Sequence, residues 1–444
     1  MNTLLIKTLF LFIQLILPPD EKPNDKEIIA KLASYSWNHP QEKVYLHADK
    51  DFYVQGEDIW FKAYLMVGPY HIPDTLSSVL YVELIHNDGT IIDRRNIHML
   101  EGLGFGDFDL PFTIIPGEYI LKAYTRYMQN YDPAFHFRKR IYILPSFQKD
   151  PPGKKTMKAN KLQSISSSDY KPIQIQFFPE GGNMAVGLQN YIAFKATDHQ
   201  GKGKDVKGVI INSQGHEVTK FKSQKFGVGI FAFKHEKEEE YIARISYDSL
   251  EFQYELPEPI QKGYAMHIKQ TGDNVFIWVR NNMGINMNNS FVIGQFRGFP
   301  FITVHAESDH NYLYSILNTK EIPSGIIQFT FFDSLGVPQC ERLVYTESEK
   351  DKINFSIGSD KKIYKKRELA LIDIHSEDLM GNPTLTNLSL SITNTAIVSK
   401  DYKKSNIRSY FNLESDLKGH IENPGYYFNP DNEDRYELLD ILML

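Results

Sequence analysis

The residues best suited to hold a metal ion lie in the segment 46–52. It contains His47, Asp49 and Asp51, and imidazole nitrogens and carboxylate oxygens are common ligands of divalent cations. The two acids also suit a second role, because aspartate side chains accept hydrogen bonds from backbone amides in turns. We favour this second role, in a turn before Tyr53, and keep His47, Asp49 and Asp51 as weak metal candidates.

A second polar cluster occupies residues 305–310. His305 and His310 are five positions apart, with Glu307 and Asp309 between them. A solvated polar loop explains the same residues and is the interpretation we favour. Neither cluster has the spacing of an HExxH zinc site. The sequence therefore predicts no resident metal and no cofactor.

Cys340 is the only cysteine of the chain. A single thiol cannot form an internal disulfide, a four-thiolate zinc site or an iron–sulfur cluster. Its position just before an apolar run favours a packing role. The sequence also lacks a Gly-x-Ser-x-Gly nucleophile elbow and a phosphate-binding loop that ends in Gly-Lys-Ser/Thr. We therefore expect no catalytic residues and predict that the protein is not an enzyme.

Length and charge narrow the classes of protein further. The chain has 444 residues, enough for about three or four domains. Lys and Arg together number 49 and Asp and Glu number 55, so the formal net charge is −6. Because nucleic-acid-binding proteins carry a basic excess, we expect no nucleic-acid partner.

Residues 1–18 have the pattern of a signal peptide. Lys7 precedes an apolar run over 9–17 that ends at Pro18. This run is shorter than the ~20 residues of a membrane span. We therefore expect an exported mature chain without a stable membrane span, in the periplasm or associated with the outer membrane; a buried N-terminal helix is the alternative. The lack of cysteine pairs favours a bacterial envelope protein over a eukaryotic secreted one.

Beyond residue 40 the sequence consists of short β-rich runs separated by Gly, Asn, Asp and Pro. The run 59–65 alternates between an apolar and a mixed face, as half-buried strands do. Three similar hairpin sequences, around Gly89, Gly215 and Gly336, recur roughly 120 residues apart. The pattern predicts an all-β chain of tandem antiparallel β-sandwiches, preceded by a short helix over 24–37.

Changes in composition indicate the domain boundaries. Three sandwiches are expected over 43–146, 173–257 and 262–348. A segment rich in Lys and Ser, over 147–172, reads as a solvated linker between the first two.

The last part of the chain is less regular. A partial fourth sandwich is expected over 352–400, with strands over 366–374 and 387–393. The remainder, 401–444, reads as a mixed tail with a C-terminal helix over 431–444. Because this helix is apolar at its end, we expect it to pack on the last domain or to continue into a longer protein.

The segment 42–65 resembles the opening of a macroglobulin-type domain of the alpha-2-macroglobulin superfamily. Tyr53 is followed by Gly56 and Glu57 and then by an alternating strand that contains Trp60. The resemblance implies macroglobulin-like or immunoglobulin-like sandwiches in which these four residues have structural roles.

The phrase over 177–203, which contains Gly181 and Gly182, looks like the second sandwich of a group of exported Bacteroidetes envelope proteins. In that group macroglobulin-like domains precede a carboxypeptidase-regulatory-like domain or a TonB-receptor plug domain. The tail is similar to the sequence segment that follows the sandwich domains in that group. This resemblance implies protein partners in the cell envelope, with an outer-membrane transporter among them.

One departure from the superfamily bears on activity. Covalent protease-trapping macroglobulins carry a thioester built from Cys-Gly-Glu-Gln, whereas Cys340 lies in Pro-Gln-Cys-Glu-Arg, so no thioester is expected. The leading prediction is a non-catalytic exported envelope scaffold. The alternatives are an endopeptidase inhibitor without a thioester, with 147–172 as the bait segment, and a glycan-binding auxiliary protein.

Overall fold

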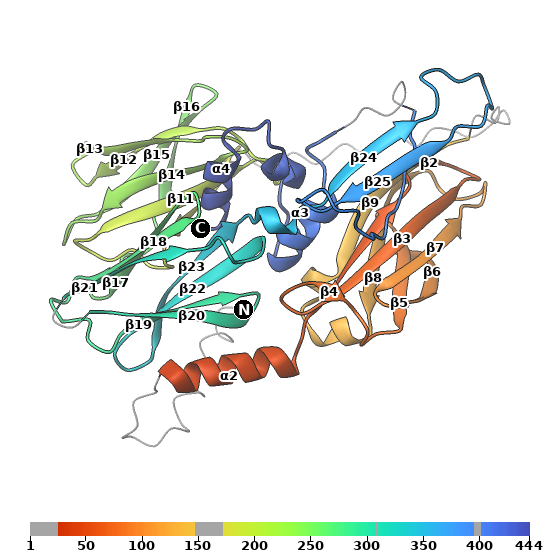
Figure 1. The fold of residues 1–444 in the computed structure, drawn as a ribbon. Coiled ribbons are helices and arrows are strands. Elements are labelled where there is room, and N and C mark those ends of the chain that lie inside the picture. The colour runs from red at the N-terminus through yellow and green to blue at the C-terminus, as the bar shows by residue number, and fades with distance from the viewer. Residues whose placement is uncertain (1–24, 147–171, 308–309, 395–400) are drawn as a thin grey trace.

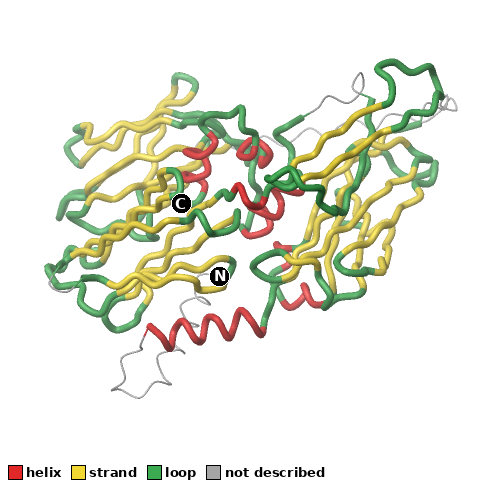
Figure 2. Tube along the Cα trace, in the orientation of Figure 1, coloured by secondary structure: helices red, strands yellow, loops and turns green. Residues whose placement is uncertain are grey.

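The computed structural model describes residues 25–146, 172–307, 310–394 and 401–444. The described part consists of an N-terminal helix, three β-sandwiches, a two-stranded hairpin and a helical tail (Figure 1). Strands dominate the three sandwiches, whereas the helices lie at the N-terminus and in the tail (Figure 2). The predicted all-β class with helices near both ends is confirmed. The predicted signal peptide, and the predicted linker apart from Pro172, lie outside the described residues.

The first sandwich consists of a four-stranded and a five-stranded sheet. In the smaller sheet β3 (Asp58–Val67) pairs with β1 (Glu42–Ala48), β4 (Ile72–Pro73) and β7 (Leu103–Asp109). The larger sheet has the order β2 (Phe52–Val54), β9 (Phe137–Leu144), β8 (Gly117–Thr125), β5 (Val79–His86) and β6 (Ile91–His98). Between β8 and β9 lie the 3-10 helices η1 (Tyr127–Asn130) and η2 (Pro133–Phe135).

Alternation along the strands produces the core of this sandwich. On β3 the side chains of Ile59, Phe61, Ala63 and Leu65 are buried, whereas Trp60 points outward. Apolar side chains from both sheets join them in one continuous cluster. The burial of one face of each sheet is the main stabilising contribution to such a fold.

The second and third sandwiches repeat the arrangement with three-stranded and four-stranded sheets. The second contains β10 (Gln174–Pro179), β11 (Gln189–Thr197) and β14 (Val228–Lys234) against β13 (Glu217–Lys222), β12 (Lys207–Asn212), β15 (Tyr241–Tyr247) and β16 (Leu250–Glu255). The third contains β17 (Tyr264–Thr271), β18 (Asn274–Asn281) and β21 (Tyr312–Asn318) against β20 (Phe299–His305), β19 (Phe291–Phe296), β22 (Gly325–Phe332) and β23 (Pro338–Thr346).

The three predicted hairpins are present as β5–β6, β12–β13 and β22–β23. Their turn glycines, Gly89, Gly215 and Gly336, have φ angles of 90°, 79° and 74°. Only glycine adopts this region without steric cost, so the sequence signal and the backbone conformation agree.

Helix α2 (Asp25–Asn38) precedes the first sandwich in sequence but packs on the third. Ile28, Ile29 and Leu32 contact the cluster that Phe291 and Phe332 form. Figure 1 shows the helix beneath β20. It therefore connects two sandwiches that are separated by the whole of the second.

The predicted fourth sandwich is a single hairpin of β24 (Asn354–Ser359) and β25 (Ile372–Glu377), preceded by η3 (Glu349–Asp351). The strand predicted over 366–374 begins only at its seventh residue, Ile372. The strand predicted over 387–393 is wrong. Side-chain bonds from Ser389 and Ser391 hold that segment against the first sandwich in place of a backbone ladder. Residues 395–400 lie outside the described part.

The C-terminal tail contains α3 (Ile407–Asn412), η4 (Glu414–Asp416), η5 (Pro424–Phe428) and α4 (Arg435–Leu442). The helix predicted over 431–444 is shorter than expected. Asp434 does not cap it, because its carboxylate accepts hydrogen bonds from Tyr426, at 2.6 Å, and from Lys225, at 3.1 Å. Among the described residues, no helix has both the length and the apolar character that crossing a membrane requires.

Candidate functional site

His47 and Asp49, two of the three weak metal candidates, bind protein groups. The Nδ1 atom of His47 lies 2.6 Å from the hydroxyl of Ser389. Asp49 Oδ1 accepts a hydrogen bond from the buried Tyr53 hydroxyl at 2.7 Å and one from the Trp60 amide at 3.1 Å. The acid thus fixes the start of β3, and the Trp60 indole remains exposed.

Asp51 points to two lysines. Its carboxylate lies 2.7 Å from the Lys139 ammonium and 2.8 Å from that of Lys404. Burial opposes ionisation of Asp51, but the two lysines outweigh it and lower its pKa. Within the described ranges, no group of three His, Cys, Asp or Glu side chains is arranged to hold a metal ion.

The described residues of the second polar cluster, 305–310, do not form a common site in the structure. His305 Nε2 lies 3.2 Å from Asp25 in helix α2. His310 Nδ1 lies 3.7 Å from the exposed Glu307. Asp309 lies outside the described residues. The two histidines therefore have different partners.

Gly56 and Glu57 build the turn before β3. Gly56 has a φ of 85°, and a Cβ atom there would lie 2.4 Å from the Phe112 ring. Glu57 accepts a hydrogen bond from the Val54 amide at 2.8 Å and one from Lys50 at 2.9 Å. Both motif residues therefore shape the backbone of this turn.

Gly181 and Gly182 form the turn at which the second sandwich meets the third. Their φ angles are 81° and 93°. The Gly181 carbonyl accepts a hydrogen bond from the Glu341 amide, and a Cβ atom on Gly181 would lie 3.1 Å from Met266 and 3.4 Å from Cys340. Burial raises the pKa of the Cys340 thiol to about 12, so this cysteine is a packing group at neutral pH.

The C-terminal tail lies between the first sandwich on one side and the second and third on the other (Figure 1). Its apolar side chains join clusters of all three. Tyr410 and Phe411 belong to the core of the first sandwich. Leu438, Leu439 and Ile441 pack with side chains of the second and third. We call this region the tail junction.

At the tail junction, Asp416 is the first carboxylate that joins different parts of the chain. It lies 2.8 Å from Arg297 of the third sandwich and 3.2 Å from Lys43 of the first. All three side chains are nearly inaccessible to solvent. Burial disfavours the ionised form, but the Lys43 and Arg297 charges prevail and lower the pKa of Asp416 to about 2.

Arg297 also binds the backbone around this carboxylate. Its guanidinium donates to the carbonyl oxygens of Pro69, Ser324 and Phe411 at 2.8 to 3.2 Å. These groups belong to the first sandwich, the third sandwich and the tail. Nearby His71 is neutral, because burial and the Arg297 charge lower its pKa to about 3. One guanidinium therefore joins three parts of the chain.

Glu180, next to the glycine pair, is the second carboxylate. It accepts hydrogen bonds from the Ile268 amide at 2.9 Å and from Arg342 at 3.0 Å. The His267 ring contacts its other oxygen at 2.7 Å. Arg342 also forms an ion pair with Asp440 of α4, at 2.7 Å. This series of ion pairs links the second sandwich, the third sandwich and the last helix.

Glu347, after β23, is the third carboxylate. It pairs with Arg408 of α3, and it lies 3.0 Å from Arg435 and 2.6 Å from the Tyr436 hydroxyl at the start of α4. Burial raises the pKa of Glu347, but the Tyr436 hydrogen bond and the arginine charges overcome this effect and lower it. Both helices of the tail thus converge on one acid of the third sandwich.

Sequence reasoning did not identify these ion pairs. The paired residues are far apart in the chain, as with Lys43 and Asp416 or Glu180 and Arg342. Lys43, Glu180, Arg435 and Asp440 lie in segments that the resemblance singled out, but the resemblance gave none of them an ionic partner. A charged residue with an unknown distant partner looks like any surface charge in a single sequence.

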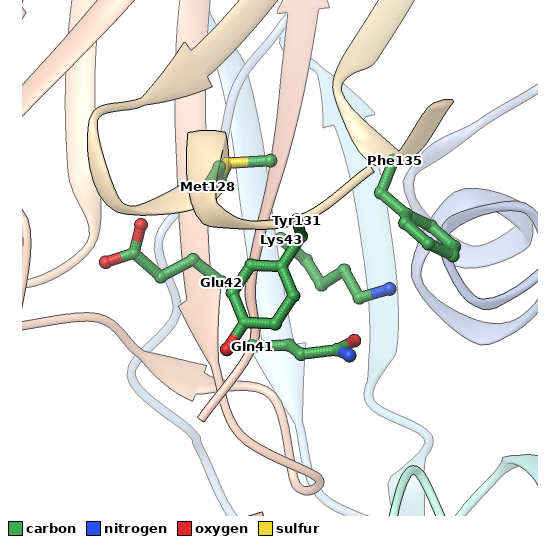
Figure 3. Close-up of a pocket in the computed structure, with 6 residues that line it drawn as sticks. All are labelled: Gln41, Glu42, Lys43, Met128, Tyr131 and Phe135. Carbon is green, nitrogen blue, oxygen red and sulfur yellow. The ribbon is translucent and has the colours of Figure 1, made fainter. Parts of the chain in front are cut away.

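Two hollows among the described residues differ greatly in size. The close-up in Figure 3 shows a pocket lined by Gln41, Glu42, Lys43, Met128, Tyr131 and Phe135. Its volume of about 10 Å³ accommodates about one water molecule. A second, open hollow of about 700 Å³ lies on the outer face of the sheet that contains β12 and β13.

Comparisons with known proteins complete the description. No family model and no curated protein matches the chain. It is similar to the solved structure of Escherichia coli alpha-2-macroglobulin activated by porcine elastase, with 9% identity and a TM-score of 0.26 over 77% of this chain and 34% of that chain. It is also similar to dimeric latent PorU from Porphyromonas gingivalis, with 11% identity and a TM-score of 0.31 over 70% and 34%.

A third similar structure is that of surface layer protein SbsC, domains 4-9, with 10% identity and a TM-score of 0.23 over 77% of this chain and 54% of that one. The chain spans about a third of the length of the alpha-2-macroglobulin and PorU chains. A likeness of this extent assigns neither a family nor an activity to the chain, so its function must be inferred from its own residues.

Proposed function

We propose that this chain is a non-catalytic, exported scaffold of the bacterial cell envelope that holds macroglobulin-like sandwiches in a fixed arrangement for protein partners. The observation that carries the proposal is the tail junction. There Asp416 binds charged side chains of the first and third sandwiches at 3.2 and 2.8 Å.

Charges at the junction favour one arrangement of the sandwiches. Removing an ion pair from water is costly unless its geometry and hydrogen bonds are satisfied. Arg297 and Arg342 form their full sets of hydrogen bonds only when residues of different sandwiches lie next to one another. A displaced sandwich would leave these groups unpaired. Fixed spacing and orientation are what a scaffold must supply to its partners.

The expected partner is an outer-membrane transporter, and the expected compartment follows from the signal-like residues 1–18. A tagged full-length chain expressed in its native host tests both. Co-purification with a transporter after cross-linking in intact cells supports the proposal. Recovery in the cytosol with unprocessed Met1 and no cross-linked envelope protein would refute it.

Glycan binding is a second candidate, and an aromatic row on the third sandwich favours it. His267, Trp278 and Tyr314 lie directly opposite one another on β17, β18 and β21. The Tyr191 ring of the second sandwich stacks on His267 at a centroid distance of 3.8 Å. Tyr312 and Tyr314 are exposed, and exposed aromatic groups on one face mark binding surfaces.

Intrinsic fluorescence tests this second candidate. Titration with a panel of soluble polysaccharides should change the emission of the wild-type chain, and Trp278→Ala should remove the change. Trp60→Ala is the matched control, since Trp60 is an exposed tryptophan of the first sandwich. No response to any polysaccharide, or the same loss in both variants, would reject glycan binding at this face.

A further inference from the structure

The loop between β24 and β25, residues 360–371, protrudes from the body of the molecule (Figure 1). It carries five cationic side chains, Lys361, Lys362, Lys365, Lys366 and Arg367. Its only acids are Asp360 and Glu368. The balance of three positive charges contrasts with the net charge of −6 for the whole chain.

Asp360 is engaged inside the loop. Its Oδ1 atom accepts a hydrogen bond from the Tyr364 hydroxyl at 2.6 Å and one from the Leu371 amide at 2.9 Å. The Tyr364 hydroxyl in turn accepts a hydrogen bond from the Lys361 amide at 3.0 Å. These bonds connect the two ends of the loop and give it a defined conformation.

Glu368 is engaged in the same way. It accepts a hydrogen bond from the Lys365 amide and pairs with the Lys361 ammonium, each at 2.6 Å. The side chains of Lys362, Lys366 and Arg367 form no ion pair with any described residue. The loop therefore neutralises its own acids and presents unpaired cations to the solvent.

Apolar side chains stand among these cations. Ile363 is 86% exposed and lies between two lysine pairs, and Leu369 is 77% exposed. Leaving such side chains in water forgoes the stabilisation that their burial would supply. Because the loop is hydrogen-bonded internally, their exposure belongs to a defined conformation.

The apolar surface continues onto the hairpin. The register of β24 and β25 places Phe355, Ile357 and Ile372 on one face, and all three are exposed. Contiguous apolar patches of this kind are uncommon on soluble chains unless they bind something.

We propose that the loop 360–371 binds the surface of a bilayer that contains anionic lipids. Its unpaired cations face the negatively charged headgroups, and Ile363 and Leu369 enter the boundary between headgroups and acyl chains. Charge complementarity favours this ligand, because basic residues beside exposed apolar ones are the combination that interfacial binding uses. The inference depends on this loop alone, so its failure would leave the scaffold proposal intact.

Vesicle flotation with the full purified chain tests the proposal. Binding is expected to phosphatidylethanolamine vesicles that contain phosphatidylglycerol, and not to phosphatidylcholine vesicles. A basic residue near an anionic surface contributes about fivefold in affinity, so Lys365→Ala with Lys366→Ala should weaken binding roughly 30-fold. Ile363→Ser should weaken it about tenfold, with most of the loss remaining at high salt.

The matched control removes two exposed lysines of the second sandwich, Lys220→Ala with Lys237→Ala, and should retain wild-type binding. Equal thermal unfolding of all variants shows that they fold. Equal binding to both vesicle types, or equal losses in the loop and control variants, would overturn the proposal. The proposal would also be overturned if the wild-type chain does not bind vesicles and instead forms a dimer, and if Ile357→Asp abolishes that dimer.

Discussion

Arg297 of the third sandwich donates a hydrogen bond to Asp416 of the tail at 2.8 Å, while Lys43 of the first sandwich lies 3.2 Å from the other oxygen of that carboxylate. A single acid thus forms ion pairs with two buried cations from different domains. The arrangement explains why the tail lies between the sandwiches, since neither cation has another carboxylate within ion-pairing distance among the described residues.

Replacing Asp416 should therefore be costly. Asp416→Ala leaves Lys43 and Arg297 buried without an anion, and we expect the free energy of unfolding to fall by about 3–5 kcal/mol. Urea denaturation measures the change. Glu307→Gln, at an exposed position, should change stability by less than about 0.5 kcal/mol. A similar small effect at Asp416 would contradict the role we assign to it.

The contribution of Asp416 should depend on pH. Its pKa falls from 3.8 to about 2 in the folded chain. A group with a depressed pKa stabilises the fold above its unfolded pKa, and this stabilisation is lost as the pH falls through the folded value. The difference in unfolding free energy between the wild-type chain and Asp416→Asn should be constant above about pH 5 and shrink toward about pH 2. A difference that grows on acidification would exclude this ion pair as its origin.

Arg342 should control the docking of the last helix. Arg342→Ala breaks the link between Glu180 and Asp440 and leaves the buried Glu180 without its cation. Hydrogen exchange of α4 should accelerate in this variant. Arg280→Ala, which removes an exposed arginine of the same sandwich, is the control and should leave exchange unchanged. Unaltered protection of α4 in both would show that apolar packing alone holds the helix.

The glycine pair offers a matched comparison of strain and crowding. Gly182→Ala meets no atom within 4 Å and should cost about 1–2 kcal/mol for its left-handed backbone. Gly181→Ala incurs the same cost and also crowds Met266 and Cys340. Thermal unfolding should therefore show a larger drop in Tm for Gly181→Ala. Equal drops would mean that the neighbouring side chains adjust freely.

Treatment with proteases distinguishes the scaffold proposal from the inhibitor alternative. If the chain acts as the scaffold that we propose, proteases should cut the segment 147–172 without being retained or inhibited. Incubation with several endopeptidases, followed by size-exclusion chromatography and a small-substrate assay, measures both. A cleaved chain that co-elutes with the protease and blocks large substrates would favour the inhibitor alternative.

Local patterns determined much of the fold. Alternating strands and hairpin glycines at Gly89, Gly215 and Gly336 predict tandem sandwiches because strand periodicity and positive φ angles are properties of neighbouring residues. The segment 387–393 also alternates, yet it forms no strand. Its serines bind His47, Tyr64 and a backbone carbonyl of the first sandwich, and this competition depends on contacts that a local pattern does not contain.

The sequence by itself determined the strand-rich architecture, the turn chemistry around Gly56 and the absence of a thioester motif. Only the tertiary structure decided that α2 lies on the third sandwich, that the tail lies between three domains, and that Asp416 meets Lys43 and Arg297. The physical reason is the sequence separation over which each interaction acts. Periodicity and backbone conformation depend on neighbouring residues. The role of a buried charge depends on distant partners that only the folded chain brings within hydrogen-bonding distance.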